Sequence, residues 1–244
     1  MATFRNPSFQ RMVERTLKKT AAALRDADVP FCLVGSLSAW VRGGPESSHD
    51  LDFGIRSCDI LKAAAALQQI GMKIEIPPED WLIKAWDGSY PEDGSPREDP
   101  ILVDLIYAPS GVPITDEVLE RADYMDVLAH KMRVLDPTDL MVMKLLSLRE
   151  QHLNLTSTIA TARAVREQID WEDLRRRCQH SPYANGFFTM AEQLGICPPA
   201  GRRQKRHLVL VEMQAGARSE VVPEQRRELA ERLREGRSLL DPDE

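Results

Sequence analysis

The first half of the chain alternates between helix-like and strand-like hydrophobic patterns. Apolar residues recur every three or four positions over residues 7–28, and Asn6 and Pro7 suit the start of a helix there. Apolar runs and period-two alternation indicate strands. Strands are expected at residues 30–34, 50–56, 72–76, 81–86 and 101–107, and two more helices at 37–41 and 59–70. This alternation is typical of a sheet covered by helices, so the fold class is α/β.

The second half becomes mostly helical. Short strands are expected at 125–130 and 132–135, followed by helices near 137–150, 155–168, 170–179 and 183–194. The last stretch is rich in charge, and residues 224–240 could form one charged helix. We therefore expect an α/β domain over residues 1–117, connecting strands and a helical domain over 118–195, and a charged C-terminal extension over 196–244, helical or partly flexible.

Composition and charge narrow the class of protein. The chain has 244 residues, of which 43% are apolar, and this excludes a wholly disordered chain. A net charge of −6 argues against a pervasive nucleic-acid-binding surface. No apolar run approaches the ~20 residues of a membrane span. The four cysteines lie far apart without zinc-like spacing, so we expect a reduced, cytoplasmic protein.

Three aspartates are candidates for chemistry. Side chains alternate across a strand, so Asp50 and Asp52 share one face, while Leu51 and Phe53 point to the core. Asp104 lies in an apolar strand, where an unpaired carboxylate is costly to bury. If these two strands are neighbours, the three carboxylates converge and raise one another's pKa. A divalent cation would remove that conflict, and oxygen ligands favour Mg²⁺ or Mn²⁺.

The pair Gly35-Ser36 is a candidate phosphate grip. It separates a predicted strand from a predicted helix. Glycine permits close approach to the backbone, and the first N–H groups of a helix attract anions. Because a metal and a helix N-terminus in one cleft suit a nucleoside triphosphate, the pattern favours phosphoryl chemistry.

These motifs resemble the nucleotidyltransferase superfamily of the DNA polymerase β type over residues 20–107. The segment from Leu135 to Leu146 is similar to the AbiEii-like and MenT-like branch, which contains toxins of bacterial toxin–antitoxin pairs. The resemblance implies a nucleotidyltransferase fold with a mixed sheet and a C-terminal helical domain. It rests on three short stretches: Leu33-Val34-Gly35-Ser36, Asp50-Leu51-Asp52-Phe53 and Val103-Asp104-Leu105-Ile106.

The resemblance also implies roles. Asp50 and Asp52 would hold Mg²⁺ or Mn²⁺, and Asp104 would bind the catalytic metal and help deprotonate the attacking hydroxyl. Gly35, Ser36 and Lys144 would contact the triphosphate, although a lysine on a Leu/Met-rich helix is also typical of a helix edge.

The implied reaction moves a nucleoside monophosphate from an NTP to a hydroxyl, with the 3′ end of a tRNA as acceptor and an antitoxin protein as partner. Two alternatives stay open, namely transfer to a small molecule such as an antibiotic and a non-catalytic NTP-binding interaction module.

Some features depart from the family pattern or have two interpretations. Thirteen residues separate Ser36 from Asp50, and Glu46-Ser47-Ser48-His49 replaces the Arg and Thr common before the acidic pair. Arg42 is a phosphate ligand or a solvated helix end, and the loop 87–100 is a flap or a plain hairpin. The basic runs 175–177 and 202–206 could hold RNA phosphates or face solvent. Trp171 is expected in the core.

Overall fold

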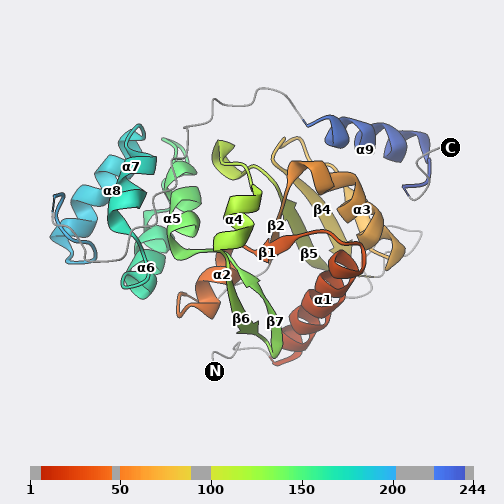
Figure 1. Ribbon diagram of the computed structural model, residues 1–244, viewed down its shortest axis with the longest axis horizontal. Coiled ribbons are helices and arrows are strands. Elements are labelled where there is room, and N and C mark those ends of the chain that lie inside the picture. The colour runs from red at the N-terminus through yellow and green to blue at the C-terminus, as the bar shows by residue number, and fades with distance from the viewer. Residues whose placement is uncertain (1–6, 46–49, 89–99, 202–222, 240–244) are drawn as a thin grey trace.

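The computed structural model describes residues 7–45, 50–88, 100–201 and 223–239, and its centre is one sheet (Figure 1). The seven strands follow the order β3-β4-β5-β2-β1-β7-β6. They are β1 (Phe31–Leu33), β2 (Asp50–Ile55), β3 (Lys73–Glu75), β4 (Leu82–Asp87), β5 (Ile101–Ile106), β6 (Asp123–Val127) and β7 (His130–Val134). All strands expected from the pattern are present, with ends shifted by at most three residues.

The sheet is mixed. β2 pairs in parallel with β5, and β1 pairs in parallel with β7, whereas the other neighbours are antiparallel. The strands expected to connect two domains, β6 and β7, lie in this same sheet and form one end of it. The α/β class with a mixed sheet is therefore confirmed.

One face of the sheet carries the main hydrophobic core. Helices α1 (Pro7–Asp26) and α3 (Ile60–Gln69) pack there, and a short 3₁₀ turn, η1 (Ser57–Asp59), precedes α3. The inward residues of the central strands are fully buried: Leu51, Phe53, Val103 and Leu105 are each at most 1% exposed. Their alternation with Asp50, Asp52 and Asp104 places the aspartates on the opposite face.

Part of that opposite face is covered by α2 (Gly35–Val41), α4 (Asp116–Arg121) and α5 (Pro137–Leu146). Leu82 and Ile106 of the sheet pack there against Val118 of α4 and Leu140 of α5. Helix α4 was not expected from the pattern, because six residues give little periodicity. A second 3₁₀ turn, η2 (Pro109–Gly111), follows β5. This packing leaves the aspartate end of the face next to α2 and α5.

The helices of the second half form a separate layer at the side of the sheet (Figure 1). They are α5, α6 (Leu155–Val165), α7 (Trp171–Cys178) and α8 (Pro182–Gln193). Asn154, Asp170 and Ser181 cap the N-termini of the last three helices through their side chains. Trp171 is 2% exposed and lies in this second core, as predicted.

The charged C-terminal stretch contains α9 (Glu224–Glu235), which packs on α3 at the far end of the molecule (Figure 1). Its Leu229 is fully buried, and Arg226 donates to the carbonyl oxygens of Pro77 and Glu79, both at 2.6 Å. Among the described residues, no helix is both long enough and apolar enough to span a membrane.

Candidate functional site

Asp52 and Asp104 face each other across two parallel strands. The register of β2 and β5 pairs Asp52 with Asp104 and Asp50 with Leu102. Directly paired residues lie on one face of a sheet with Cβ atoms roughly 5 Å apart. The condition set by the sequence, that these two strands are neighbours, is therefore met, and the pairing brings the candidate carboxylates together. Asp50 is exposed, whereas Asp104 is only 8% exposed.

The carboxylates perturb one another. Burial, together with the charges of Asp104 and Asp50, raises the pKa of Asp52 to about 7. Burial also raises the pKa of Asp104, with Asp50 adding to the shift and Lys84 opposing it. Like charges held close together destabilise the ionised forms, so this cluster favours a cation.

The Asp52 carboxylate packs directly against the backbone of Gly35, in the space that a side chain at residue 35 would occupy. The backbone of Gly35 is left-handed, with φ +63°, and a Cβ there would lie 1.8 Å from Oδ2 of Asp52. No other residue type fits this contact without moving the carboxylate. The backbone N–H of Ser36 donates to Asp52, which lowers the pKa of Asp52 against the larger effect of burial. This N–H was expected to face a phosphate, so the phosphate role of Ser36 would fall to its hydroxyl group.

Lys144 approaches the same carboxylate from α5. Burial lowers the pKa of Lys144, and the charge of Asp52 opposes that shift. The charge of Lys144 in turn lowers the pKa of Asp52 against the larger effect of burial. The helix reaches this position because Asp136 caps its start, accepting from the N–H groups of Thr138 and Asp139 at 2.7 and 3.2 Å. The structure thus brings Gly35, Ser36, Asp50, Asp52, Asp104 and Lys144 into one neighbourhood.

The donor set suits a hard divalent cation. The three aspartates offer only oxygen ligands, and their repulsion would fall on binding Mg²⁺ or Mn²⁺. Within the ranges that the structure describes, no group of three His, Cys, Asp or Glu side chains is already arranged around a common metal position. Asp104 instead pairs with Lys84, whose Nζ lies 3.2 Å from Oδ1.

Lys84 was missed by sequence reasoning. It lies on β4, and the antiparallel register of β4 and β5 pairs it directly with Asp104. The one signal in the sequence is its polar character between the buried residues Ile83 and Ala85, which places it on the polar face. Only the register across two strands reveals the partner.

The other basic candidates have structural partners. Arg42 has a side chain only 4% exposed, which donates to the carbonyl oxygens of Val134 and Leu135 and pairs with Asp123 at 2.7 Å. It is neither a phosphate ligand of this site nor a solvated helix end, because these contacts bury it between α2 and β7. Residues 202–206, His49 and residues 89–99 of the expected loop lie outside the described residues.

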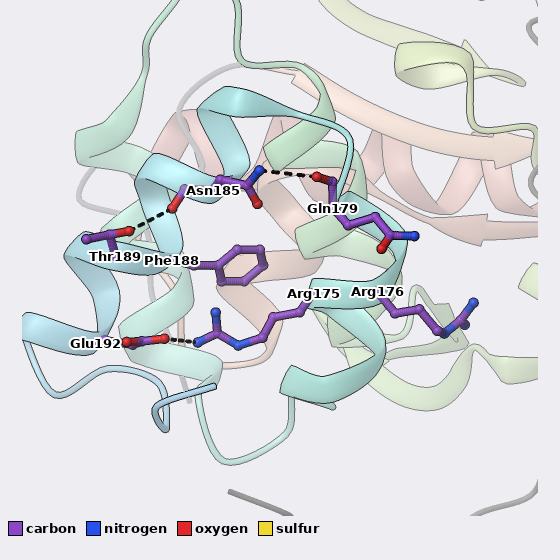
Figure 2. Close-up of a pocket in the computed structure, with 7 residues that line it drawn as sticks. All are labelled: Arg175, Arg176, Gln179, Asn185, Phe188, Thr189 and Glu192. Atoms are coloured by element: carbon purple, nitrogen blue, oxygen red, sulfur yellow. Dashed lines mark hydrogen bonds and ion pairs between the residues drawn. The ribbon is translucent and has the colours of Figure 1, made fainter. Parts of the chain in front are cut away.

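The arginines of α7 are also paired, as Figure 2 shows for Arg175. Arg175 pairs with Glu192 at 2.8 Å and lies over the ring of Phe188. Arg176 pairs with Asp173, and Arg177 pairs with Asp139 at 2.7 Å. Arg175 and Arg177 therefore take part in helix packing, whereas the Arg176 side chain is 54% exposed and pairs within its own helix.

A pocket of about 430 Å³ lies between α7 and α8 (Figure 2). It contains none of the candidate site residues, and its polar groups largely bond to one another. Thr189 donates to the carbonyl oxygen of Asn185, and Asn185 donates to that of Gln179. The lining residues are Arg175, Arg176, Gln179, Asn185, Phe188, Thr189 and Glu192.

Comparison with known proteins gives weak structural likenesses. No protein-family model matches the chain, and no curated protein matches it. ANT(2")-Ia in complex with adenylyl-2"-tobramycin is 12% identical with a TM-score of 0.45, over 72% of this chain and 97% of that chain. The lincosamide antibiotic adenylyltransferase LnuA, lincomycin-bound, is 16% identical with a TM-score of 0.40, over 61% of this chain and 93% of that chain. The function proposed below rests on the residues of the site itself.

Proposed function

We propose that this protein is a nucleotidyltransferase that moves a nucleoside monophosphate from an NTP to a hydroxyl group and releases pyrophosphate. The observation that supports this most is the cross-strand pair of Asp52 and Asp104, with Asp52 held against the Gly35 backbone. Clustered carboxylates beside a lysine and a glycine turn suit the binding of a metal-complexed triphosphate.

Asp50, Asp52 and Asp104 would hold Mg²⁺, or Mn²⁺, in this reaction. When bound, the cation supplies positive charge that offsets both the carboxylates and the phosphates. Lys144 would add a positive charge toward the triphosphate from α5, and the hydroxyl group of Ser36, next to the Gly35 turn, would contact its oxygens. These residues bind and orient the nucleotide.

Asp104 would take the proton from the acceptor hydroxyl. The oxygen then forms a bond to the α-phosphorus, while the bond from that phosphorus to the oxygen bridging to the β-phosphate breaks. Pyrophosphate leaves with that electron pair, so atoms and charge balance. A positioned general base of this kind contributes roughly 10²–10⁴-fold to the rate.

For the acceptor we favour a small hydroxyl-bearing molecule over the 3′ end of a tRNA. Arg175 and Arg177 of α7, which could have held RNA phosphates, are paired with acidic side chains and are only 21% and 11% exposed, and Arg42 is buried. The toxin role and the antitoxin partner, expected from the family resemblance, stay hypotheses. We place the reaction in the cytoplasm, which suits the free state of all four cysteines and the supply of NTPs.

The test is incubation with each α-labelled NTP, Mg²⁺, and either total tRNA or a panel of hydroxyl-bearing small molecules, including aminoglycosides and lincosamides. Label on a small molecule supports our choice of acceptor, and label on tRNA supports the alternative. A protein that binds NTP yet labels no acceptor would favour the non-catalytic module.

Asp104→Asn tests the chemistry. It keeps the shape of the side chain but removes the charge, so we expect transfer to fall at least about a hundredfold while NTP affinity changes less. Asp126→Asn on the exposed strand β6 serves as the matched control and should keep full activity. Full transfer by Asp104→Asn would show that Asp104 is an ordinary strand residue.

A further inference from the structure

Lys84 stands between two acidic side chains on one face of the sheet. The registers of β3, β4 and β5 pair it with Glu75 on one side and with Asp104 on the other. The ammonium group takes Asp104, with Nζ 3.2 Å from Oδ1. Glu75 instead accepts a hydrogen bond of 2.8 Å from the indole N–H of Trp86. Lys84 therefore forms an ion pair with Asp104 and has a second acidic residue, Glu75, opposite it on the other neighbouring strand.

The pair of Lys84 and Asp104 is partly shielded from water. Their side chains are 23% and 12% exposed. An ion pair at this depth interacts more strongly than an exposed one, and removal of one member leaves the other poorly compensated. In the described part of the chain, no other cation forms an ion pair with Asp104. Lys144 lies toward Asp52 instead.

We propose that Lys84 is a positioning residue that pairs with Asp104 as long as no nucleotide and no metal are bound. When the nucleotide and the divalent cation bind, the ammonium group of Lys84 leaves Asp104 for Glu75, and Asp104 becomes a ligand of the cation. This rests on the proposed function, since it concerns the same carboxylate. A lysine on Asp104 competes with a cation that comes alone. A cation that binds together with an NTP has phosphate oxygens as further ligands, so it binds more tightly and displaces Lys84 from Asp104. Lys84 thus makes metal loading depend on nucleotide.

The experiment measures Mn²⁺ binding by electron paramagnetic resonance, with and without NTP, on folded variants checked by circular dichroism. Lys84→Met removes the charge at similar length, so Mn²⁺ alone should bind about tenfold more tightly, as expected for losing a like charge a few ångströms away. Lys84→Arg keeps the charge and should behave like the wild type. Lys62→Met, an exposed lysine on α3, is the control and should change nothing.

Glu75 gives a second, opposite test. Glu75→Gln keeps an acceptor for Trp86 but removes the alternative partner of Lys84, so Mn²⁺ should bind several-fold more weakly in the presence of NTP. The same change in a Lys84→Met background should have a clearly smaller effect, because the lysine is gone and only the direct charge of Glu75 on the site is lost. An equal loss in both backgrounds would mean that Glu75 acts by its charge alone and would overturn the movement of Lys84.

The outcomes separate this proposal from the proposed function. If the wild type binds Mn²⁺ with NTP, and Lys84→Met binds Mn²⁺ alone no more tightly than the wild type, the role of Lys84 is refuted and the nucleotidyltransferase proposal stands. If the wild type binds neither Mn²⁺ nor Mn²⁺ with any of the four NTPs, both proposals fall. A Lys84→Met protein with tighter Mn²⁺ binding and weaker dependence on NTP supports the positioning role.

Discussion

At the scale of single residues, the site depends on a glycine that has no space for a side chain. A Cβ at Gly35 would overlap three atoms of Asp52, because all three would lie closer than van der Waals contact, the nearest at 1.8 Å. The left-handed backbone adds a second constraint, because a residue with a Cβ is strained there by roughly 1–2 kcal/mol. The position of the carboxylate and the identity of residue 35 are therefore linked.

We expect Gly35→Ala to lower the free energy of unfolding by more than backbone strain alone. Gly71 offers the matched control, since it also has a positive φ, +82°, but no atom lies within 4 Å of its Cβ position. Gly71→Ala should cost about 1 kcal/mol, and Gly35→Ala at least about 1 kcal/mol more from overpacking. Urea unfolding measures both, and equal losses would show that the contact with Asp52 relaxes freely.

At the scale of elements, a buried carboxylate joins helix α1 to strand β4. Asp87 accepts hydrogen bonds from the hydroxyl of Thr16 at 2.6 Å and from the ammonium of Lys19 at 2.7 Å. Burial alone would raise the pKa of Asp87, but the bonds from Lys19 and Thr16 prevail and hold it below its usual value. The folded protein thus stabilises the ionised form of the Asp87 side chain.

The free energy of unfolding should therefore depend on pH through Asp87, and it should fall in acid. Since the folded pKa of Asp87 is lowered, its contribution to stability is present above about pH 4 and is lost as the pH falls through the folded pKa. Asp87→Asn should cost about 1–3 kcal/mol at pH 7, and the difference from the wild type should shrink in acid. Urea unfolding at pH 7 and pH 3.5 measures this, with Asp126→Asn as the exposed control. A difference independent of pH would contradict the ionic interpretation.

At the scale of the whole molecule, Asp139 joins the sheet to the helical layer. Its side chain is fully buried, and Arg121 of α4 donates to both of its oxygens at 3.0 Å. Arg177 of α7 adds a third contact at 2.7 Å. One carboxylate on α5 therefore connects three helices, and α5 is also the helix that presents Lys144 to the site.

We expect Asp139→Asn to destabilise the protein by about 3 kcal/mol, because two guanidinium groups lose their shared buried counter-charge. Asp173→Asn is the control. Asp173 also pairs with Arg177, but its side chain is 30% exposed, so its loss should cost less than about 1 kcal/mol. Thermal unfolding measures both variants. A small effect at Asp139 would show that apolar packing alone holds the two layers together.

Most helices and strands of this protein, and the shared face of its aspartates, follow from the order of residues alone. Helix and strand periods are local properties, so α1, β2, β5 and the helices after Pro137 follow from the pattern, as does the common side of Asp50 and Asp52. The neighbourhood of β2 and β5 could be stated only as a condition, because strand pairing joins residues some fifty positions apart.

The partners of the charged side chains, by contrast, depend on how distant segments pack in the fold. Lys84 meets Asp104 because of a register that no local pattern contains. Arg42 is buried because Val134, at the end of β7, and Leu135 after it supply carbonyl oxygens from about ninety residues away. The arginines of α7 look like a surface patch in sequence and are ion pairs in space. The hydrophobic period of a helix or strand is a property of residues close together in sequence, so it can be seen in the sequence. The partner of a buried charge is any group that the fold places within a few ångströms of it, and that group can come from anywhere in the chain.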